Sequence, residues 1–133
     1  MKYSILLVDD EMATLGILAG IITRRFPDVV LYTAESGTVA LEIFETRPID
    51  LVIADINMAG MSGVQMTDRM RAIKADTRVI FLTGDSESQV MNGSAQKGFL
   101  FDQLIAKPVG VKDLFEAIDR CLLSRHNVAS ASK

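Results

Sequence analysis

The chain has 133 residues, of which 49% are hydrophobic and 23% charged, which fits one globular domain with a single core and excludes wholesale disorder. Its net charge of −3 argues against a general binder of nucleic acid or of anionic membranes. Cys121 is the one cysteine, so a disulfide scaffold is excluded, and a reducing, cytoplasmic setting with Cys121 as a core thiol is expected.

The first half of the chain alternates between short apolar runs and helical patterns. Ile5–Val8 is a continuous apolar run, typical of a strand buried on both faces of a parallel sheet. Met12–Phe26 carries apolar residues at helical spacing and predicts a helix. Val29–Ala34 predicts a weaker strand, and Ser36 is placed to cap a helix that ends before Pro48.

The second half repeats this alternation. Its predicted elements are a strand at Leu51–Ala54, a helix that begins at Ser62, a strand at Val79–Leu82, a helix from Ser86 or Ser88 to Lys97-Gly98, a weaker strand at Leu100–Ala106 and a helix over Val111–Leu123. Strand and helix thus alternate five times. This order predicts a single α/β domain, a doubly wound five-stranded parallel sheet with right-handed crossovers and five helices on its two faces.

Polar residues follow four of the five predicted strands directly. They are Asp9, Asp10 and Glu11 after the first, Asp55 and Asn57 after the third, Thr83 and Asp85 after the fourth, and Lys107 after the fifth. In an open parallel sheet, ligands bind at the carboxyl ends of the strands. We therefore expect these side chains to converge on one edge of the sheet.

The residue types at this edge indicate phosphoryl-transfer chemistry. Neighbouring carboxylates repel one another unless a cation joins them, and oxygen ligands suit Mg²⁺ above all. Asp9, Asp10 and Asp55 are candidate ligands, and the backbone carbonyl of Asn57 could complete the set. A divalent cation, a lysine, a hydroxyl and a reachable carboxylate together resemble a site that transfers phosphoryl groups. The carboxylate itself can be the acceptor and form an aspartyl-phosphate.

Four short segments carry a family resemblance. "LLVDDE", "LVIADINMAGMSG", "FLTG" and "IAKP", in this order and each at a predicted strand end, together resemble the receiver domain of two-component response regulators. The resemblance runs from about Lys2 to Leu123. It implies a flavodoxin-like, CheY-like (βα)5 fold with strand order 2-1-3-4-5. The receiver domain would span residues 1–124, and the small, polar residues 125–133 predict a flexible C-terminal tail or a truncated linker.

The resemblance assigns a role to each residue of the acidic cluster. Asp55 would accept phosphate from a sensor histidine kinase or a phosphotransfer protein. Asp10 would bind Mg²⁺ directly, and Asp9 would help, often through water. Asn57 would offer its backbone carbonyl to the same ion, for which Mn²⁺ is an alternative.

Further roles follow from the same resemblance. Thr83 and Lys107 would contact the phosphoryl oxygens, and the bond between Lys107 and Pro108 would be cis. Asn57 and Asp85 would border the path of the attacking water and so tune self-dephosphorylation. The protein is therefore expected to be a phosphoacceptor and not a turnover enzyme.

Two departures from the family pattern concern the loop after the acceptor and the switch. Ala59 stands where the family usually has proline, which predicts a slightly looser loop. Leu104 stands where the family usually has an aromatic residue that turns inward as the Thr83 hydroxyl moves. We therefore expect Thr83 to move on phosphorylation while the last strand and helix change modestly. Partners would then recognise the phosphorylated state through the fourth predicted helix, through Phe99 and Phe101, or through a homodimer formed by the last helix and strand.

Other functions compatible with these residues are an aspartate-nucleophile phosphatase and a pseudo-receiver that binds partners without phosphorylation. A phosphatase of that kind usually carries its acidic pair after the first strand, whereas "DIN" follows the third. The complete set of polar residues argues against a pseudo-receiver. The expected partners are an upstream kinase or phosphotransfer protein and a downstream target or missing output domain. No nucleic acid is expected to bind directly. No membrane is expected as a partner either, because no apolar run reaches the roughly 18 residues that a membrane span requires.

Overall fold

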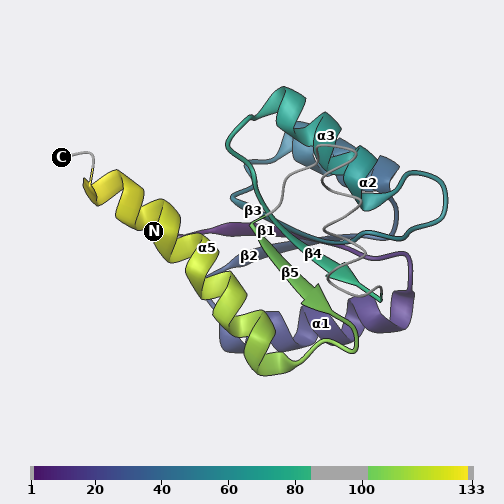
Figure 1. Ribbon diagram of the computed structural model, residues 1–133, viewed down its shortest axis with the longest axis horizontal. Coiled ribbons are helices and arrows are strands. Elements are labelled where there is room, and N and C mark those ends of the chain that lie inside the picture. Colours follow the sequence, from purple (N-terminus) through teal and green to yellow (C-terminus); the bar gives the residue numbers. More distant parts are fainter. Residues whose placement is uncertain (1, 85–101, 132–133) are drawn as a thin grey trace.

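The computed structural model describes residues 2–84 and 102–131. Its elements are β1 (Ser4–Val8), α1 (Met12–Arg25), β2 (Val30–Ala34), α2 (Gly37–Thr46), β3 (Leu51–Asp55), α3 (Gly63–Ile73), β4 (Arg78–Thr83), β5 (Gln103–Ala106) and α5 (Val111–Ala131). The strands form one parallel sheet in the order β2-β1-β3-β4-β5. Helices α1 and α5 cover one face of this sheet, and α2 and α3 cover the other (Figure 1). The predicted fold and strand order are confirmed.

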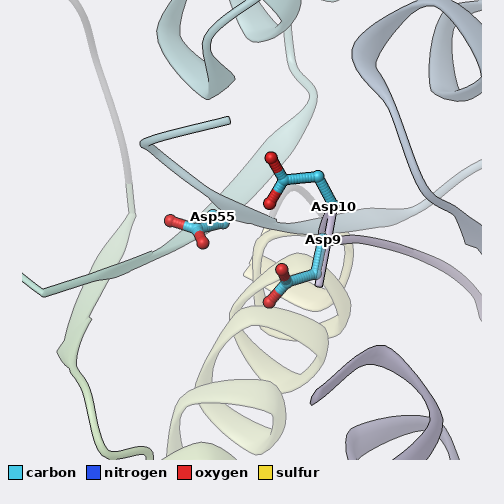
Figure 2. A group of neighbouring side chains, drawn as sticks. All are labelled: Asp9, Asp10 and Asp55. Atoms are coloured by element: carbon cyan, nitrogen blue, oxygen red, sulfur yellow. The ribbon is translucent and has the colours of Figure 1, made fainter. Parts of the chain in front are cut away.

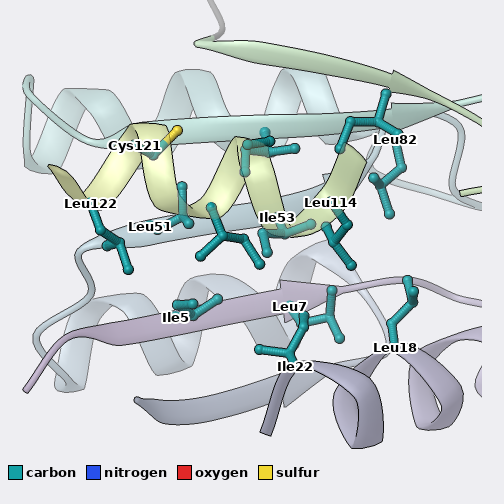
Figure 3. Close-up of a cluster of buried hydrophobic side chains, with 14 of the residues drawn as sticks. Ile5, Leu7, Leu18, Ile22, Leu51, Ile53, Leu82, Leu114, Cys121 and Leu122 are labelled. Atoms are coloured by element: carbon teal, nitrogen blue, oxygen red, sulfur yellow. The ribbon is translucent and has the colours of Figure 1, made fainter. Parts of the chain in front are cut away.

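The two sheet faces explain why the central strands are apolar throughout. Side chains alternate between the faces of a strand, so Ile5 and Leu7 of β1 pack toward α1 and α5, while Leu6 and Val8 pack toward α2 and α3. Figure 3 shows the first of these clusters, in which strand residues meet Leu18 of α1 and other helix residues. Both layers bury large aliphatic side chains, which supplies the main stabilisation of the fold.

Local sequence signals fix where α2 and α3 begin. The Ser36 side chain accepts a hydrogen bond from the Val39 N–H (3.2 Å), as the predicted cap requires. At α3, the Ser62 hydroxyl accepts from the Gln65 N–H (3.2 Å), and the Gln65 side chain accepts from the Ser62 N–H (3.0 Å), forming a capping box. Gly63 follows at once, and a Cβ there would overlap the backbone carbonyl of Asp55. Helix α3 therefore begins directly against the end of β3.

The last helix is longer than the sequence pattern predicts. Helix α5 runs over Val111–Ala131, whereas the apolar periodicity predicts an end at Leu123. No glycine or proline follows Leu123 to stop the helix, so it continues into the polar segment. The predicted helix from Ser86 or Ser88 to Gly98 lies outside the described residues, which contain four helices. Within these ranges, no helix combines the length and the apolar character needed to cross a bilayer.

Asp102 ties the start of β5 to the start of β4. Its Oδ2 accepts a hydrogen bond from the Val79 N–H (2.7 Å), and its Oδ1 accepts one from Arg78 Nη1 (3.1 Å). Arg71 Nη2 of α3 lies 3.9 Å from the same carboxylate.

Cys121 of α5 lies in the cluster between the sheet and helices α1 and α5, where it is buried as a core thiol. Burial raises the pKa of this thiol to about 11.

Candidate functional site

The parallel register brings four strand ends to one edge of the sheet. It aligns them through the pairs Val8–Ala54, Asp55–Leu82 and Thr83–Ala106. The residues that follow β1, end β3 and follow β5 therefore meet above the central strands. This is the edge at which the sequence places the candidate phosphoacceptor site.

The carboxylates of Asp9, Asp10 and Asp55 form an acidic cluster at this edge (Figure 2). One oxygen atom from each lies within 4.8 Å of the others. Asp9 is 0% exposed and Asp55 is 6% exposed, whereas Asp10 is open to solvent. Negative charges this close repel one another, so the cluster needs positive charge or hydrogen-bond donors around it.

Asp55 receives a donor on each oxygen. Its Oδ1 accepts a hydrogen bond from the Asn57 N–H (3.1 Å), and its Oδ2 accepts one from Lys107 Nζ (2.6 Å). The two hydrogen bonds come from different directions, so together they fix the orientation of the carboxylate. Asp55 thus carries an oriented carboxylate at the centre of the site.

Asp9 has a less complete set of partners. Its Oδ1 accepts a hydrogen bond from the Glu11 N–H (2.9 Å). Its buried Oδ2 has no hydrogen-bond partner among the described residues and lies 3.6 Å from Lys107 Nζ. Burial raises the pKa of Asp9, and the charges of Asp55 and Asp10 act in the same direction against the opposing effects of the Glu11 N–H and Lys107.

Lys107 is the cation that faces both buried acids. Burial alone would lower its pKa, but its hydrogen bond to Asp55 and the charges of Asp55, Asp9 and Glu11 outweigh burial, so the pKa is raised. Its backbone N–H donates to the Thr83 carbonyl (2.7 Å), which holds the start of the β5–α5 loop against β4. The bond from Lys107 to Pro108 is cis, as the resemblance implied.

Asp10 is bound to the loop on the far side of the acidic cluster. Its Oδ2 accepts a hydrogen bond from the Ala59 N–H (2.9 Å). The contact joins the loop after β1 to the loop after β3. Sequence reasoning singled out Ala59 only as a departure from proline, although a non-proline residue there already indicated an additional backbone donor.

A family model of the response regulator receiver domain matches residues 5–119. The chain belongs to this family. The curated relatives of this chain include the heme response regulator HssR of Staphylococcus aureus, which is 32% identical over an alignment of 133 positions that covers 96% of this chain and 54% of HssR. The chain therefore spans about half the length of the curated relatives it matches.

Solved receiver domains share the fold over nearly the whole chain. A response regulator receiver domain protein from Clostridium thermocellum is 27% identical, covers 95% of this chain with 98% of its own and has a TM-score of 0.82. The response regulator TrrA from Thermotoga maritima, solved with Mg²⁺ and a beryllium fluoride, is 30% identical over 90% of this chain and 98% of its own, with a TM-score of 0.76. Both relatives support the assignment of this chain as a two-component signalling domain.

Lys107 contacts both Asp9 and Asp55, and Asp10 completes the cluster of carboxylates within 4.8 Å of one another. Thr83 is the last residue of the neighbouring strand, β4. Thr83 is 1% exposed. Leu104 is paired with Phe81, two residues along the β4–β5 ladder from the Thr83–Ala106 pair, on the sheet face that α2 and α3 cover. Asn57 is exposed two residues after Asp55. Asp85, Phe99 and Phe101 lie outside the described residues.

The donor set of the acidic cluster fits a divalent cation of the Mg²⁺ type. It consists of carboxylate oxygens alone, which are the ligands that hard cations prefer. The buried Asp9 Oδ2 lacks a hydrogen-bond partner in the described part of the chain, as expected for an oxygen that faces a cation. Asp9, Asp10 and Asp55 would hold such an ion, and the Asn57 carbonyl could add a ligand.

Proposed function

We propose that Asp55 accepts a phosphoryl group from the phosphohistidine of a sensor histidine kinase or phosphotransfer protein, in a reaction that requires Mg²⁺ or Mn²⁺. The aspartyl-phosphate then changes the contacts of the domain with other proteins. The observation that carries this proposal is the arrangement around Asp55. Its carboxylate is bonded to Lys107 at 2.6 Å and belongs to a three-carboxylate cluster at the sheet edge.

In the proposed transfer, an Asp55 oxygen attacks the phosphorus atom and forms an O–P bond. The P–N bond of the phosphohistidine breaks, and its electron pair returns to the imidazole nitrogen. Lys107 would move from its bond with Asp55 to a phosphoryl oxygen, and Thr83 would donate its hydroxyl to another. Asp9, Asp10, Asp55 and the Asn57 carbonyl would hold a cation, which would supply positive charge to the phosphoryl group.

Loss of the phosphate is proposed to need no second protein. Asn57 stands exposed beside the acceptor, where its amide could orient a water molecule for attack on phosphorus. Asp85 is proposed to act from the other side, in the segment that follows β4. The domain would thus set its own signal lifetime without being a turnover enzyme on other substrates.

The proposed output runs through Thr83 and Leu104. Thr83 would move toward the phosphoryl group, and Leu104, its neighbour on the same sheet face, would fill part of the space left behind. Leucine buries less surface than an aromatic ring, so a modest change at β5 and α5 is expected. Partners would be a downstream target or an output domain, in a cytoplasmic setting, with no nucleic acid or membrane bound by the receiver domain. A homodimer through α5 and β5 is a further proposed arrangement.

The domain limits enter the same proposal. Residues 1–124 would form the receiver domain, and residues 125–133 a flexible tail or a linker to a further part. Helix α5 runs through most of this proposed tail, so a linker would leave the domain as a continuation of the helix.

The test is phosphorylation by acetyl phosphate, followed by intact mass spectrometry. With Mg²⁺, the wild-type chain should gain one phosphoryl group, and the gain should disappear in a chelator. Asp55→Asn should abolish it, because an amide oxygen is a poor nucleophile and carries no charge to bind the cation. Asp68→Asn, an exposed aspartate on α3, is the matched control and should label as the wild type does. Equal labelling of Asp55→Asn and the wild type would contradict the proposal.

A further inference from the structure

The hydrogen bond between Ala59 and Asp10 joins two parts of the chain that are 49 residues apart. It is 2.9 Å long and ends on the Asp10 Oδ2 atom. A carboxylate has two oxygens, so this contact leaves the Asp10 Oδ1 atom for an ion. The bond therefore fixes the direction of the carboxylate while preserving its capacity as a ligand.

Charge repulsion favours rotamers that turn the Asp10 carboxylate away from the cluster. It is exposed, and it stands beside the carboxylates of Asp9 and Asp55 within 4.8 Å. Repulsion and side-chain entropy both favour rotamers in which an exposed carboxylate points into water. A backbone donor on the far side of the cluster opposes this rotation, because a hydrogen bond to an ionised group is stronger than one between neutral groups.

The Ala59 N–H lies in a short loop that is anchored on both sides of it. Met58, directly before it, is buried among the residues under α2 and α3. Met61 packs so closely on the start of α2 that a Cβ at Gly37 would lie 2.9 Å from its sulfur atom. The loop is closed by the hydrogen bond from the Gly63 N–H to the Ile56 carbonyl (2.8 Å). The donor therefore sits at a defined position relative to Asp55.

We infer that the backbone N–H of Ala59 is a positioning group that holds Asp10 in place for Mg²⁺. This inference rests on the proposed function, because it assumes that Asp10 is a ligand of the ion. The loop after β3 would then have two roles at the ion. The Asn57 carbonyl would be a ligand, and the Ala59 N–H would hold the ligand Asp10 by a hydrogen bond. Hydrogen-bond partners that orient metal ligands contribute strongly to metal affinity.

Two variants remove the donor in different ways. Ala59→Pro lacks the N–H, and a semisynthetic chain with lactic acid in place of Ala59 replaces the amide by an ester and keeps the side chain. Mg²⁺ affinity is measured by calorimetry without any phosphodonor. Both variants should bind Mg²⁺ about tenfold more weakly than the wild type, as is usual when the partner of a ligand is lost. Asp68→Asn on the exposed face of α3 leaves the loop and the cluster unchanged and should bind as the wild type does.

An NMR measurement separates positioning from a general effect on the fold. The Ala59 amide proton should move upfield in metal-free Asp10→Ala, because its acceptor is gone. In the Asp10→Ala background, the ester should no longer change Mg²⁺ affinity. Wild-type affinity in the ester chain, or tighter binding, would overturn the inference and leave the proposed function standing. A wild-type chain that binds no Mg²⁺ would overturn both.

Discussion

Acidic residues at the two ends of the parallel strands differ in how closely they are spaced and in how completely they are hydrogen-bonded. At the edge where the strands begin, Asp50 Oδ2 accepts from the Ser4 N–H (2.8 Å), and Asp102 accepts from Val79 and Arg78. At the edge where they end, three carboxylates crowd together, and Asp9 Oδ2 lacks a hydrogen-bond partner within the described ranges. The difference lies in spacing, because the acids at the first edge are separate from one another and paired with donors. The acids at the second edge also have donors, but they repel one another at short range, and a bound cation would relieve this repulsion.

Basic side chains reinforce the contrast at the beginning of the strands. Arg71 Nη2 donates to the Thr77 carbonyl (3.3 Å), and Lys74 Nζ donates to the Ile49 carbonyl (3.0 Å). Both close the end of α3 onto neighbouring loops. At the other edge, Lys107 alone among the described lysines and arginines has an ion-pair contact with the acidic cluster. Stability and binding capacity are thus divided between the two edges.

The largest expected effect comes from a substitution at Gly63, where the start of α3 packs against the end of β3. Gly63→Ala should lower the free energy of unfolding by about 3 kcal/mol, because the new Cβ meets the Asp55 backbone, which cannot move aside. Urea denaturation measures the loss. Gly16→Ala on the exposed face of α1 meets no atom within 4 Å and should instead stabilise the chain slightly. Equal effects of the two substitutions would contradict the close packing at Gly63.

The next effect tests the paired acid at the opposite edge. Asp102→Ala should cost about 2 kcal/mol, since it leaves the Val79 N–H and the half-buried Arg78 without their acceptor. Asp10→Ala, measured by the same denaturation in a chelator, should cost much less because it also relieves repulsion in the cluster. If Asp10→Ala proved the more damaging of the two, the division between the edges would be wrong.

Mg²⁺ should stabilise the chain by binding at the acidic cluster, and substitutions at the opposite edge should not change this stabilisation. At about ten times its dissociation constant, the ion should stabilise the wild-type chain by about 1.4 kcal/mol through mass action. Thermal unfolding with and without Mg²⁺ measures the shift. Asp102→Asn should keep the full shift from its own lower baseline, and Asp10→Asn should reduce it. An undiminished shift in Asp10→Asn would remove Asp10 from the proposed ligands.

The smallest effect concerns pH. Burial raises the pKa of Asp9 in the folded state above the usual value for an aspartate, so Asp9 contributes most to stability at pH values below that usual pKa. This contribution is lost as the pH rises through the folded pKa. In a chelator, Asp9→Asn should therefore lose less stability than the wild type between pH 4 and neutral pH, by roughly 1 kcal/mol or less. Parallel stability curves for the two chains would show that Asp9 does not titrate as inferred.

The order of the elements and the residues at the strand ends were both predictable from sequence. Ile5–Val8 is apolar at every position, so it indicated a strand covered on both faces, and parallel topology then placed Asp9 and Asp55 on one edge. The metal and phosphate roles of these residues stay predictions.

Other features depend on coordinates that no pattern encodes. The partner of the Ala59 N–H is set by how two distant loops approach, and the need for glycine at position 63 arises from the entry angle of α3 onto β3. The extent of α5 was underestimated for a different reason. The apolar periodicity marks only the part of a helix that packs on the sheet, and α5 continues beyond it.

The buried thiol of Cys121 has a practical consequence. Only 3% of the residue is exposed, and its pKa of about 11 keeps it protonated at neutral pH. A thiolate-seeking reagent can therefore modify it only when α5 separates from the sheet. Because the chain has one cysteine, the alkylation rate reports how often that separation occurs, with no label added. The same rate, followed while the acidic cluster binds ions or phosphodonors, measures whether binding there changes how often α5 separates from the sheet.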